Sequence, residues 1–258
     1  MSLPSPLDFT ALEAAHLSWP RVRALAQGGA VALLPVGSTE AHGPHLPLAV
    51  DVLIAQAVCR EVAQRLDARG QQALLFPPIA YGLTDFAAAF SGTVSLQAGT
   101  TRALLADALA GIAGHGFGAT LAVNHHLEPA HFRVVHEAAK AARERTGARI
   151  LVPDHRRPPT APLLGREFTH GGSHAGNYET ALMLAAAPHL VDREALSRLP
   201  ALEVDLPARI KAGARDFHEA GGPDAYFGDP QGATPEEGAR LLALLADAVL
   251  AALDAPAH

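Results

Sequence analysis

The sequence has few of the residues that would direct it to nucleic acid, to an oxidising compartment or into a membrane. Lysine is rare and the formal net charge is -6, so no basic face is expected to attract nucleic acid. The single cysteine, Cys59, excludes an internal disulfide framework, and its apolar helical surroundings favour a buried thiol. No apolar run reaches about 18 residues, so no membrane span is expected.

Two further features are missing or rare in the sequence, a signal-peptide pattern and aromatic residues. The N-terminus lacks a basic stretch followed by a long apolar one, so we expect no signal peptide and a cytoplasmic protein. Aromatic residues make up only 5% of a chain that is 49% hydrophobic, so Ala, Leu and Val must form the core. Histidine, in contrast, is abundant with 14 residues, and it is the commonest metal ligand and a proton carrier near neutral pH.

Strand-like and helical patterns alternate along the chain. Continuous apolar runs typical of buried strands lie at 30–36, 72–79, 118–126 and 148–154. Helical spacing lies at about 12–26, 52–66, 100–116, 129–147, 178–188 and 235–253. This alternation predicts an α/β fold with a mostly parallel sheet and helices on both faces, in one domain over 1–258. The long Pro- and Gly-rich segments 155–177 and 216–238 are expected to be functional loops.

Ligand-type side chains follow the ends of two predicted strands. Glu40 and His42 come after the first strand, and their spacing of two points both side chains the same way in an extended segment. Asp51 follows at a helix start, and His126 and Glu128 follow the third strand at the same spacing of two. Ligands bind beyond the carboxyl ends of strands in open α/β sheets, so these five residues could surround a pair of divalent ions. Mixed His and carboxylate ligands suit Zn, Mn or Fe.

Plainer interpretations exist for each residue. Asp51 could be a helix N-cap, Glu40 and His42 could form an internal ion pair, and His126 with Glu128 could be an ordinary strand end. These interpretations are not independent, because burying several ionisable groups at the ends of apolar strands is costly unless they are paired or metal-bound. A shared metal site accounts for all five residues together.

Five segments, in order along the chain, resemble motifs of the creatininase family of metal-dependent amidohydrolases. They are LLPVGSTEAHGPHLPLAVD, FSGTVSL, VNHHLEP, SHAGNYETALML and FGDPQGATPEEG. The resemblance implies a creatininase-like three-layer fold and a site for two ions bridged by Asp51. Glu40 and His126 would hold one ion. His42 and Glu128 would hold the other.

The resemblance also implies catalytic residues. The acid/base histidine of the family falls on His174, and Glu179, at a helix start, is expected to orient His174 or to contact a metal. In the implied reaction a metal-bridging hydroxide attacks the carbonyl of a small-molecule amide, and His174 passes a proton to the leaving nitrogen. The glycines at 171 and 172 would let backbone approach the substrate closely.

Departures from the family pattern leave the substrate open. Creatinine-hydrolysing members line their pocket with tryptophans, whereas the single Trp of this chain, Trp19, lies outside the motifs. Creatinine itself is therefore not the expected substrate. Another branch trims the C-terminus of a small precursor peptide, and a non-catalytic metal-binding member is a third alternative. Relatives commonly form hexamers, so the resemblance implies a homo-oligomer.

The remaining histidines are weaker candidates for the site. His45 lies within the first motif, where it would support the ligands or pack in its loop, and His170 would face the substrate if the long loop covers the site. The others are expected on ordinary surfaces: His16, His115, His131, His136, His155, His189, His218 and His258.

Overall fold

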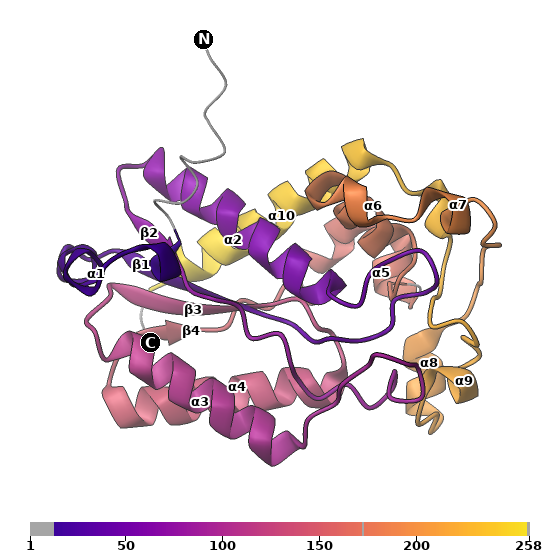
Figure 1. The fold of residues 1–258 in the computed structure, drawn as a ribbon, viewed down its shortest axis with the longest axis horizontal. Helices are drawn as coiled ribbons and strands as arrows, with labels where there is room; N and C mark the ends of the chain where they lie inside the picture. The colour runs from indigo at the N-terminus through magenta and orange to yellow at the C-terminus, as the bar shows by residue number, and fades with distance from the viewer. Residues whose placement is uncertain (1–12, 172, 257–258) are drawn as a thin grey trace, which may run out of the picture.

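A parallel β-sheet between two layers of helices organises the protein in the computed structural model, which describes residues 13–171 and 173–256 (Figure 1). The strands β1 (Val31–Val36), β2 (Ala73–Leu75), β3 (Ala119–Asn124) and β4 (Ile150–Leu151) lie in the order β2-β1-β3-β4. The central pair β1 and β3 stays in register from Val31 opposite Ala119 to Val36 opposite Asn124. The predicted fold class and all four predicted strands are confirmed, with the two edge strands shorter than expected.

The long predicted helices are also present. They are α1 (Trp19–Gln27), α2 (Val50–Asp67), α3 (Ala98–Ala113), α4 (Pro129–Thr146), α6 (Asn177–Ala186) and α10 (Pro235–Asp254). The helix expected over 12–26 is instead a short 3-10 turn, η2 (Ala14–His16), followed by α1, because Leu17 is extended between them; Leu12 lies outside the described residues. Pro20, early in α1, has the backbone angle that a helix start requires.

Short helices occupy the two segments that were expected to be loops and also the stretch between them after α6, for which the sequence predicted no element. They are η3 (Ala161–Leu164), α5 (Arg166–His170), η4 (Pro188–Leu190), α7 (Arg193–Leu196), α8 (Leu206–Lys211), α9 (Phe217–Ala220) and η5 (Pro230–Gly232). Asp192, Asp205 and Asp216 cap α7, α8 and α9 by accepting hydrogen bonds from backbone amides of the first turn. Helices of one turn bury too little apolar surface to leave a periodic pattern, which is why the sequence did not reveal them.

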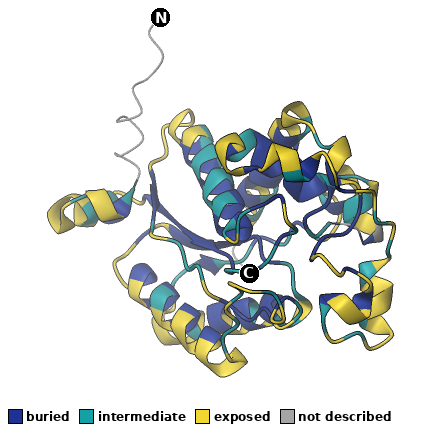
Figure 2. Cartoon of the chain, turned by 45° about the vertical axis from the view of Figure 1, so that its right-hand side comes forward, coloured by how far each residue is buried: buried dark blue, intermediate teal, exposed yellow. Residues whose placement is uncertain are grey.

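Alternate side chains of β1 enter two different cores, as expected for a strand buried on both faces. Val31 and Leu33 belong to the core formed with α2, α6 and α10, whereas Ala32 and Leu34 belong to the core formed with α3 and α4. Figure 1 shows α2 and α10 on one side of the sheet and α3 and α4 on the other. In Figure 2 the strands are buried and the outer surfaces of the helices are exposed.

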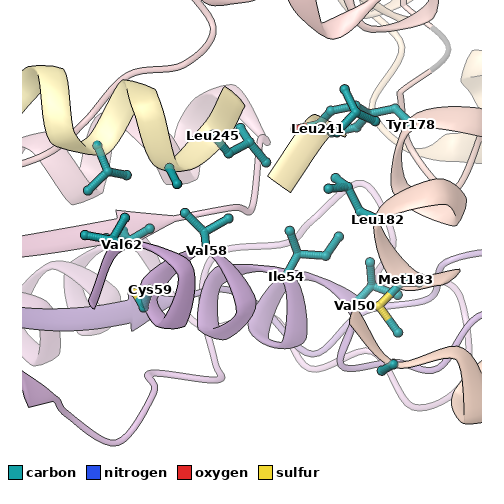
Figure 3. Packing of buried hydrophobic residues seen from close by; sticks show 14 of the residues in the cluster. Val50, Ile54, Val58, Cys59, Val62, Tyr178, Leu182, Met183, Leu241 and Leu245 are labelled. Carbon is teal, nitrogen blue, oxygen red and sulfur yellow. The ribbon is translucent and has the colours of Figure 1, made fainter. Parts of the chain in front are cut away.

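The α2, α6 and α10 core is built from aliphatic side chains at helical spacing (Figure 3). Val50, Ile54 and Val58 of α2 face Leu182 of α6 and Leu245 of α10, and all five are at most 2% exposed. Cys59, also on α2, is fully buried, which confirms the expected buried thiol. Among the described residues, no helix has the length and apolar character needed to cross a membrane.

Gly37 joins this scaffold to the functional region, because it lets the end of β1 lie against the start of α2. A β-carbon at Gly37 would lie 2.7 Å from the backbone nitrogen of Val52 and 2.8 Å from the β-carbon of Asp51. Gly37→Ala is therefore expected to lower the free energy of unfolding by about 1–3 kcal/mol, as overpacking does. Chemical denaturation measures this change.

Gly111 provides the matched control. It lies inside α3, where a β-carbon would meet nothing within 4 Å. Gly111→Ala is expected to leave stability unchanged or raise it by up to about 1 kcal/mol, because alanine loses less backbone freedom on folding. Equal stability of the two variants would contradict the close approach at Gly37.

Candidate metal centre

Four of the predicted metal ligands meet beyond the carboxyl ends of β1 and β3. Glu40 and His42 lie in the segment after β1, Asp51 is the second residue of α2, and His126 lies two residues beyond β3. Each is at most 2% exposed. Asp51 does not cap α2, since that helix has Ala49 at its N-cap. The backbone amide of Ser38 donates to Asp51 Oδ2 at 3.3 Å and so helps to fix the carboxylate.

His126 turns a lone pair toward two carboxylates. Its Nε2 lies 2.9 Å from the carbonyl oxygen of Leu83, which can only accept, so Nε2 carries the proton of the neutral ring. The unprotonated Nδ1 then lies 3.1 Å from Glu40 Oε1 and 3.0 Å from Asp51 Oδ2. These three atoms need a positive charge between them, which either a proton on Nδ1 or a metal ion would supply.

His42 faces Asp51 Oδ1 in the same way as His126 faces Asp51 Oδ2. Its Nδ1 donates to the backbone carbonyl of Glu40 at 3.1 Å, and its buried Nε2 has no hydrogen-bond partner. That Nε2 lies 3.4 Å from Asp51 Oδ1 and 3.5 Å from Glu179 Oε2. A histidine that donates one ring nitrogen to a backbone carbonyl and aims the other at a site is the usual geometry of a metal ligand.

The charges of the site fit two divalent cations. Burial lowers the pKa of His42, but the carboxylates of Glu179 and Asp51 outweigh burial and raise it to about 10. Burial likewise opposes the charge of His126, yet Glu40 and Asp51 hold its pKa well above the ordinary value. The carboxylates thus favour protonation of both imidazoles. Metal ions bound between the same atoms would balance the negative charge of the carboxylates in place of these protons. Donors about 2.1 Å from an ion lie roughly 3 to 3.5 Å apart, as these atoms do.

Three groups of described residues could each hold an ion. Each offers three ligand atoms within 4.8 Å of one another: Glu40, Asp51 and His126; His42, Asp51 and Glu179; and Glu40, His42 and His174. Asp51 belongs to the first two groups, and its bridging position stays a prediction. The structure brings Glu179 to His42, where the resemblance had led us to expect Glu128.

Neighbouring groups hold the carboxylates in place. The hydroxyl of Thr84 donates to Glu40 Oε2, which leaves Oε1 to face His126. The backbone amide of Ala175 donates to Glu179 Oε2 at 2.6 Å. Ala175 adopts a φ of 51°, a left-handed backbone conformation that a non-glycine residue rarely adopts, and this turn carries His174 and Glu179 to the site together.

His174 lies beside the ligands as an oriented, neutral base. Its Nε2 donates to the carbonyl oxygen of Ala41 at 3.0 Å, so Nδ1 keeps a lone pair, 3.9 Å from Glu40 Oε1. Burial and the nearby charge of His42 lower its pKa to about 4. The ring packs at a tilt against His42 and Phe217, with centroid distances of 4.4 and 4.3 Å.

Glu128 lies at the edge of the centre. Its Oε2 accepts a hydrogen bond from the backbone amide of Phe86 at 3.3 Å, and burial raises its pKa to about 7. Within the described chain it joins none of the three groups of ligand atoms, although it lines the same cavity. Its predicted place as a metal ligand stays a prediction.

Sequence reasoning missed several residues that support the centre. His131 and His155 were expected on the surface, which is wrong, because they are 0% and 6% exposed. His131 donates from Nε2 to Asn124 Oδ1 at 3.1 Å, and Asn124 in turn donates to the carbonyl of His126 at 2.8 Å, which fixes the turn after β3. The clue was the position of His131, five residues after His126 on the first turn of α4.

His45 is a buried supporting residue, since its Nε2 hydrogen-bonds to the hydroxyl of Thr180 at 2.8 Å on α6. Gly171 has a φ of 104° and lies against α8, where a β-carbon would be 2.8 Å from the backbone nitrogen of Leu206. Gly172 and the side chain of His170 lie outside what the structure describes.

A cavity of about 300 Å³ opens onto the centre. Its floor is formed by the ionisable groups: Glu40, Asp51, His126, Glu128, His174 and Glu179. Its walls are apolar and come from several segments, including Phe168 and Phe217 in the two segments that were expected to be functional loops. Within the described part of the chain, no tryptophan lines it. A buried cluster of carboxylates and imidazoles at the bottom of an apolar cavity, beyond the carboxyl ends of parallel strands, is typical of a metallohydrolase of the α/β class.

Comparison with known proteins agrees with this class. The family model described as "Creatininase: Creatinine amidohydrolase" matches residues 15–253. The chain belongs to the creatininase family, as the sequence motifs predicted, and is therefore a hydrolase of that family. The mycofactocin precursor peptide peptidase of Mycobacterium ulcerans is 35% identical over 231 residues, which cover 83% of this chain and 81% of that protein. The creatinine amidohydrolase of Pseudomonas putida is 33% identical over 194 residues, which cover 69% and 72%.

Solved structures of the family have the same fold. A creatininase described as the Mn form superposes with a TM-score of 0.75 and 28% identity, over 94% of this chain and 97% of that chain. A mutant creatininase of the Zn-Zn type has a TM-score of 0.73 at 26% identity and covers 94% of this chain and 96% of its own. The metals named for these two relatives are consistent with the buried ligand groups found in this chain.

Proposed function

We propose that this protein hydrolyses a C–N amide bond of a small molecule with the help of two divalent metal ions, Zn, Mn or Fe. Glu40, Asp51 and His126 would hold one ion, and His42, Asp51 and Glu179 the other. The proposal depends on one observation: ring nitrogens of two histidines face the two oxygens of the buried Asp51 carboxylate. His126 Nδ1 lies 3.0 Å from Oδ2, and His42 Nε2 lies 3.4 Å from Oδ1.

Two ions in such a site supply a water of lowered pKa and polarise the carbonyl of the substrate. The remaining work falls to this chain. Thr84 and the backbone amides of Ser38 and Ala175 orient the carboxylates. His174 Nδ1, free of hydrogen bonds while Nε2 is held by Ala41, accepts a proton and passes it to the leaving nitrogen. The apolar walls exclude competing water from the bond that breaks.

Peptide trimming is the second candidate. It is supported by the mycofactocin precursor peptide peptidase of M. ulcerans, which shares 35% identity with this chain. The known creatininases include a mutant complexed with creatine, at 25% identity and a TM-score of 0.74. The absence of tryptophan from the lining of this cavity argues against creatinine itself as the substrate.

The proposed reaction is tested by incubating the metal-loaded protein with a panel of linear amides, cyclic amides including creatinine, and short peptides. We expect release of an amine and a carboxylic acid from at least one member, with creatinine among the poorest substrates. Cleavage confined to peptides would favour the second candidate. Full metal content with no hydrolysis of any member would contradict both and would support a non-catalytic metal-binding protein. Light scattering of the same preparation tests the homo-oligomer that the family implies.

Variants of Glu179 and Glu128 are expected to differ in metal content, which distinguishes the roles of the two residues. Glu179→Gln is expected to release one ion of two, because Glu179 Oε2 lies 3.5 Å from His42 Nε2 among the ligand atoms. Glu128→Gln is expected to keep both ions, because Glu128 lines the cavity but belongs to none of the three ligand groups of the described residues. Elemental analysis after gel filtration gives the ratio. Loss of an ion from the Glu128 variant alone would reinstate the pairing of Glu128 with His42 that the sequence predicted.

A further inference from the structure

The cavity has three zones with different chemistry. Its floor is acidic and would repel an anion in the absence of bound cations. Its middle is enclosed by large apolar side chains that come from four separate segments: Phe86, Phe168, Leu206, Ile210 and Phe217. Its third zone is formed by the end of α8, where Lys211 is the last residue of the helix.

Lys211 is unusual in this chain. Among the described residues that line the cavity it is the single Lys or Arg, and the other lysine of the sequence is Lys140. Lys140 is paired with Glu144 at 3.3 Å, whereas in residues 13–171 and 173–256 no carboxylate lies within ion-pair distance of Lys211. Lys211 is exposed, so its ammonium group belongs to the mouth of the cavity rather than to its floor.

We propose that Lys211 binds a carboxylate of the substrate, so that the preferred substrates are amides that carry a free carboxylate and a bulky apolar group. The amide would lie at the floor near Asp51, the apolar group between the Phe86, Phe168 and Phe217 rings, and the carboxylate at the mouth. This inference rests on the proposed amide hydrolysis for the identity of the reacting bond. Both a small acylated amino acid and the C-terminus of a peptide have the required chemistry, and a lysine side chain at an apolar cavity mouth selects for it by charge complementarity.

Binding of a matched pair of probes tests the inference, with chromatography of each titrated sample to show whether any probe was hydrolysed. The pair is N-acetyl-L-phenylalanine and its carboxamide, N-acetyl-L-phenylalaninamide, titrated calorimetrically into the zinc-loaded protein. We expect the acid to bind roughly fivefold more tightly than the amide, as for a solvent-accessible ion pair. Lys211→Met should abolish the preference, Lys211→Arg should keep it, and Lys211→Glu should reverse it toward the amide.

Lys140→Met is the matched control, because it removes the other lysine from an exposed site on α4. It should keep the full preference for the acid, and thermal unfolding should confirm that all variants are folded. A preference for the acid that persists in the Lys211→Met protein would mean that the carboxylate binds the metal ions, and would overturn the inference. Equal binding of the two probes by the unaltered protein, or binding of neither, would overturn it as well.

Turnover measured separately distinguishes the two proposals. If the acid preference depends on Lys211 but no amide is hydrolysed, the reaction is wrong and the carboxylate site stands. If amides are hydrolysed with equal kcat/KM for acids and carboxamides, the reaction stands and the role of Lys211 is wrong. If both stand, Lys211→Met should raise KM for free acids about fivefold with little change in kcat, as expected for a residue that binds substrate equally in ground and transition states.

Discussion

Asp51→Ala is expected to release both metal ions and to lower amide hydrolysis by about a thousandfold or more. The reason is geometric, because among the described residues Asp51 is the one carboxylate whose two oxygens face different imidazoles. The distance is 3.0 Å between Oδ2 and His126 Nδ1 and 3.4 Å between Oδ1 and His42 Nε2. No other described residue belongs to both the His126 and the Glu179 ligand groups. Elemental analysis and an amide assay on the same preparation measure the two effects.

Asp107→Ala is the control for this variant. It removes an exposed carboxylate that pairs with Arg145 at 2.6 Å on the far side of the helix layer, and it should keep both ions and full activity. Circular dichroism should show that the Asp51 variant is folded, and Asp51→Asn, which preserves the shape of the side chain, should lose the ions in the same way. If the Asp51→Ala protein kept two ions and normal turnover, Asp51 would not be a bridging ligand, and the proposed metal centre would be wrong.

His174→Ala is expected to lower turnover by about 10²–10⁴-fold while both ions stay bound. His174 Nδ1 lies 3.9 Å from Glu40 Oε1 and its ring lines the cavity, so the side chain is close enough to serve the reacting bond. Burial and His42 lower its pKa to about 4, which keeps the ring neutral and able to accept a proton. Single-turnover assays with measured metal content test this expectation.

The structure also offers a competing position for His174, since Glu40, His42 and His174 form a third possible ligand group. Loss of an ion from the His174→Ala protein would place this histidine among the ligands and would contradict its role as a proton carrier. His189→Ala removes an exposed histidine of η4 and should change neither quantity.

The sheet and the long helices could be predicted because each leaves a periodic or continuous apolar pattern. The run 30–36 became β1, and its alternate residues Val31 and Ala32 enter different cores, as a strand between two helix layers requires. The short helices α5, α7, α8 and α9 could not be predicted, since their positions depend on caps such as Asp205 and on contacts with distant segments. Lys211 escaped notice for the same reason, as α8 alone brings it to the cavity.

The sequence predicted most of the side chains that lie together in the candidate site, but it did not predict which of them approach one another. Glu40, His42, Asp51 and His126 were found from strand ends and motif spacing, and the structure brings them together. Spacing along the chain does not decide which carboxylate approaches which imidazole. Glu179 reaches His42 only because the left-handed turn at Ala175 directs the start of α6 toward the segment after β1. The burial of His131 likewise depends on contacts with Leu83 and Asn124, which lie far apart in sequence.

The most direct test of the account is a crystal structure of the manganese-loaded protein with anomalous scattering data. The account predicts two anomalous peaks roughly 3.5–4 Å apart, with Asp51 between them, His126 on one and His42 on the other. A single peak, or two peaks that do not share Asp51, would contradict the dinuclear centre.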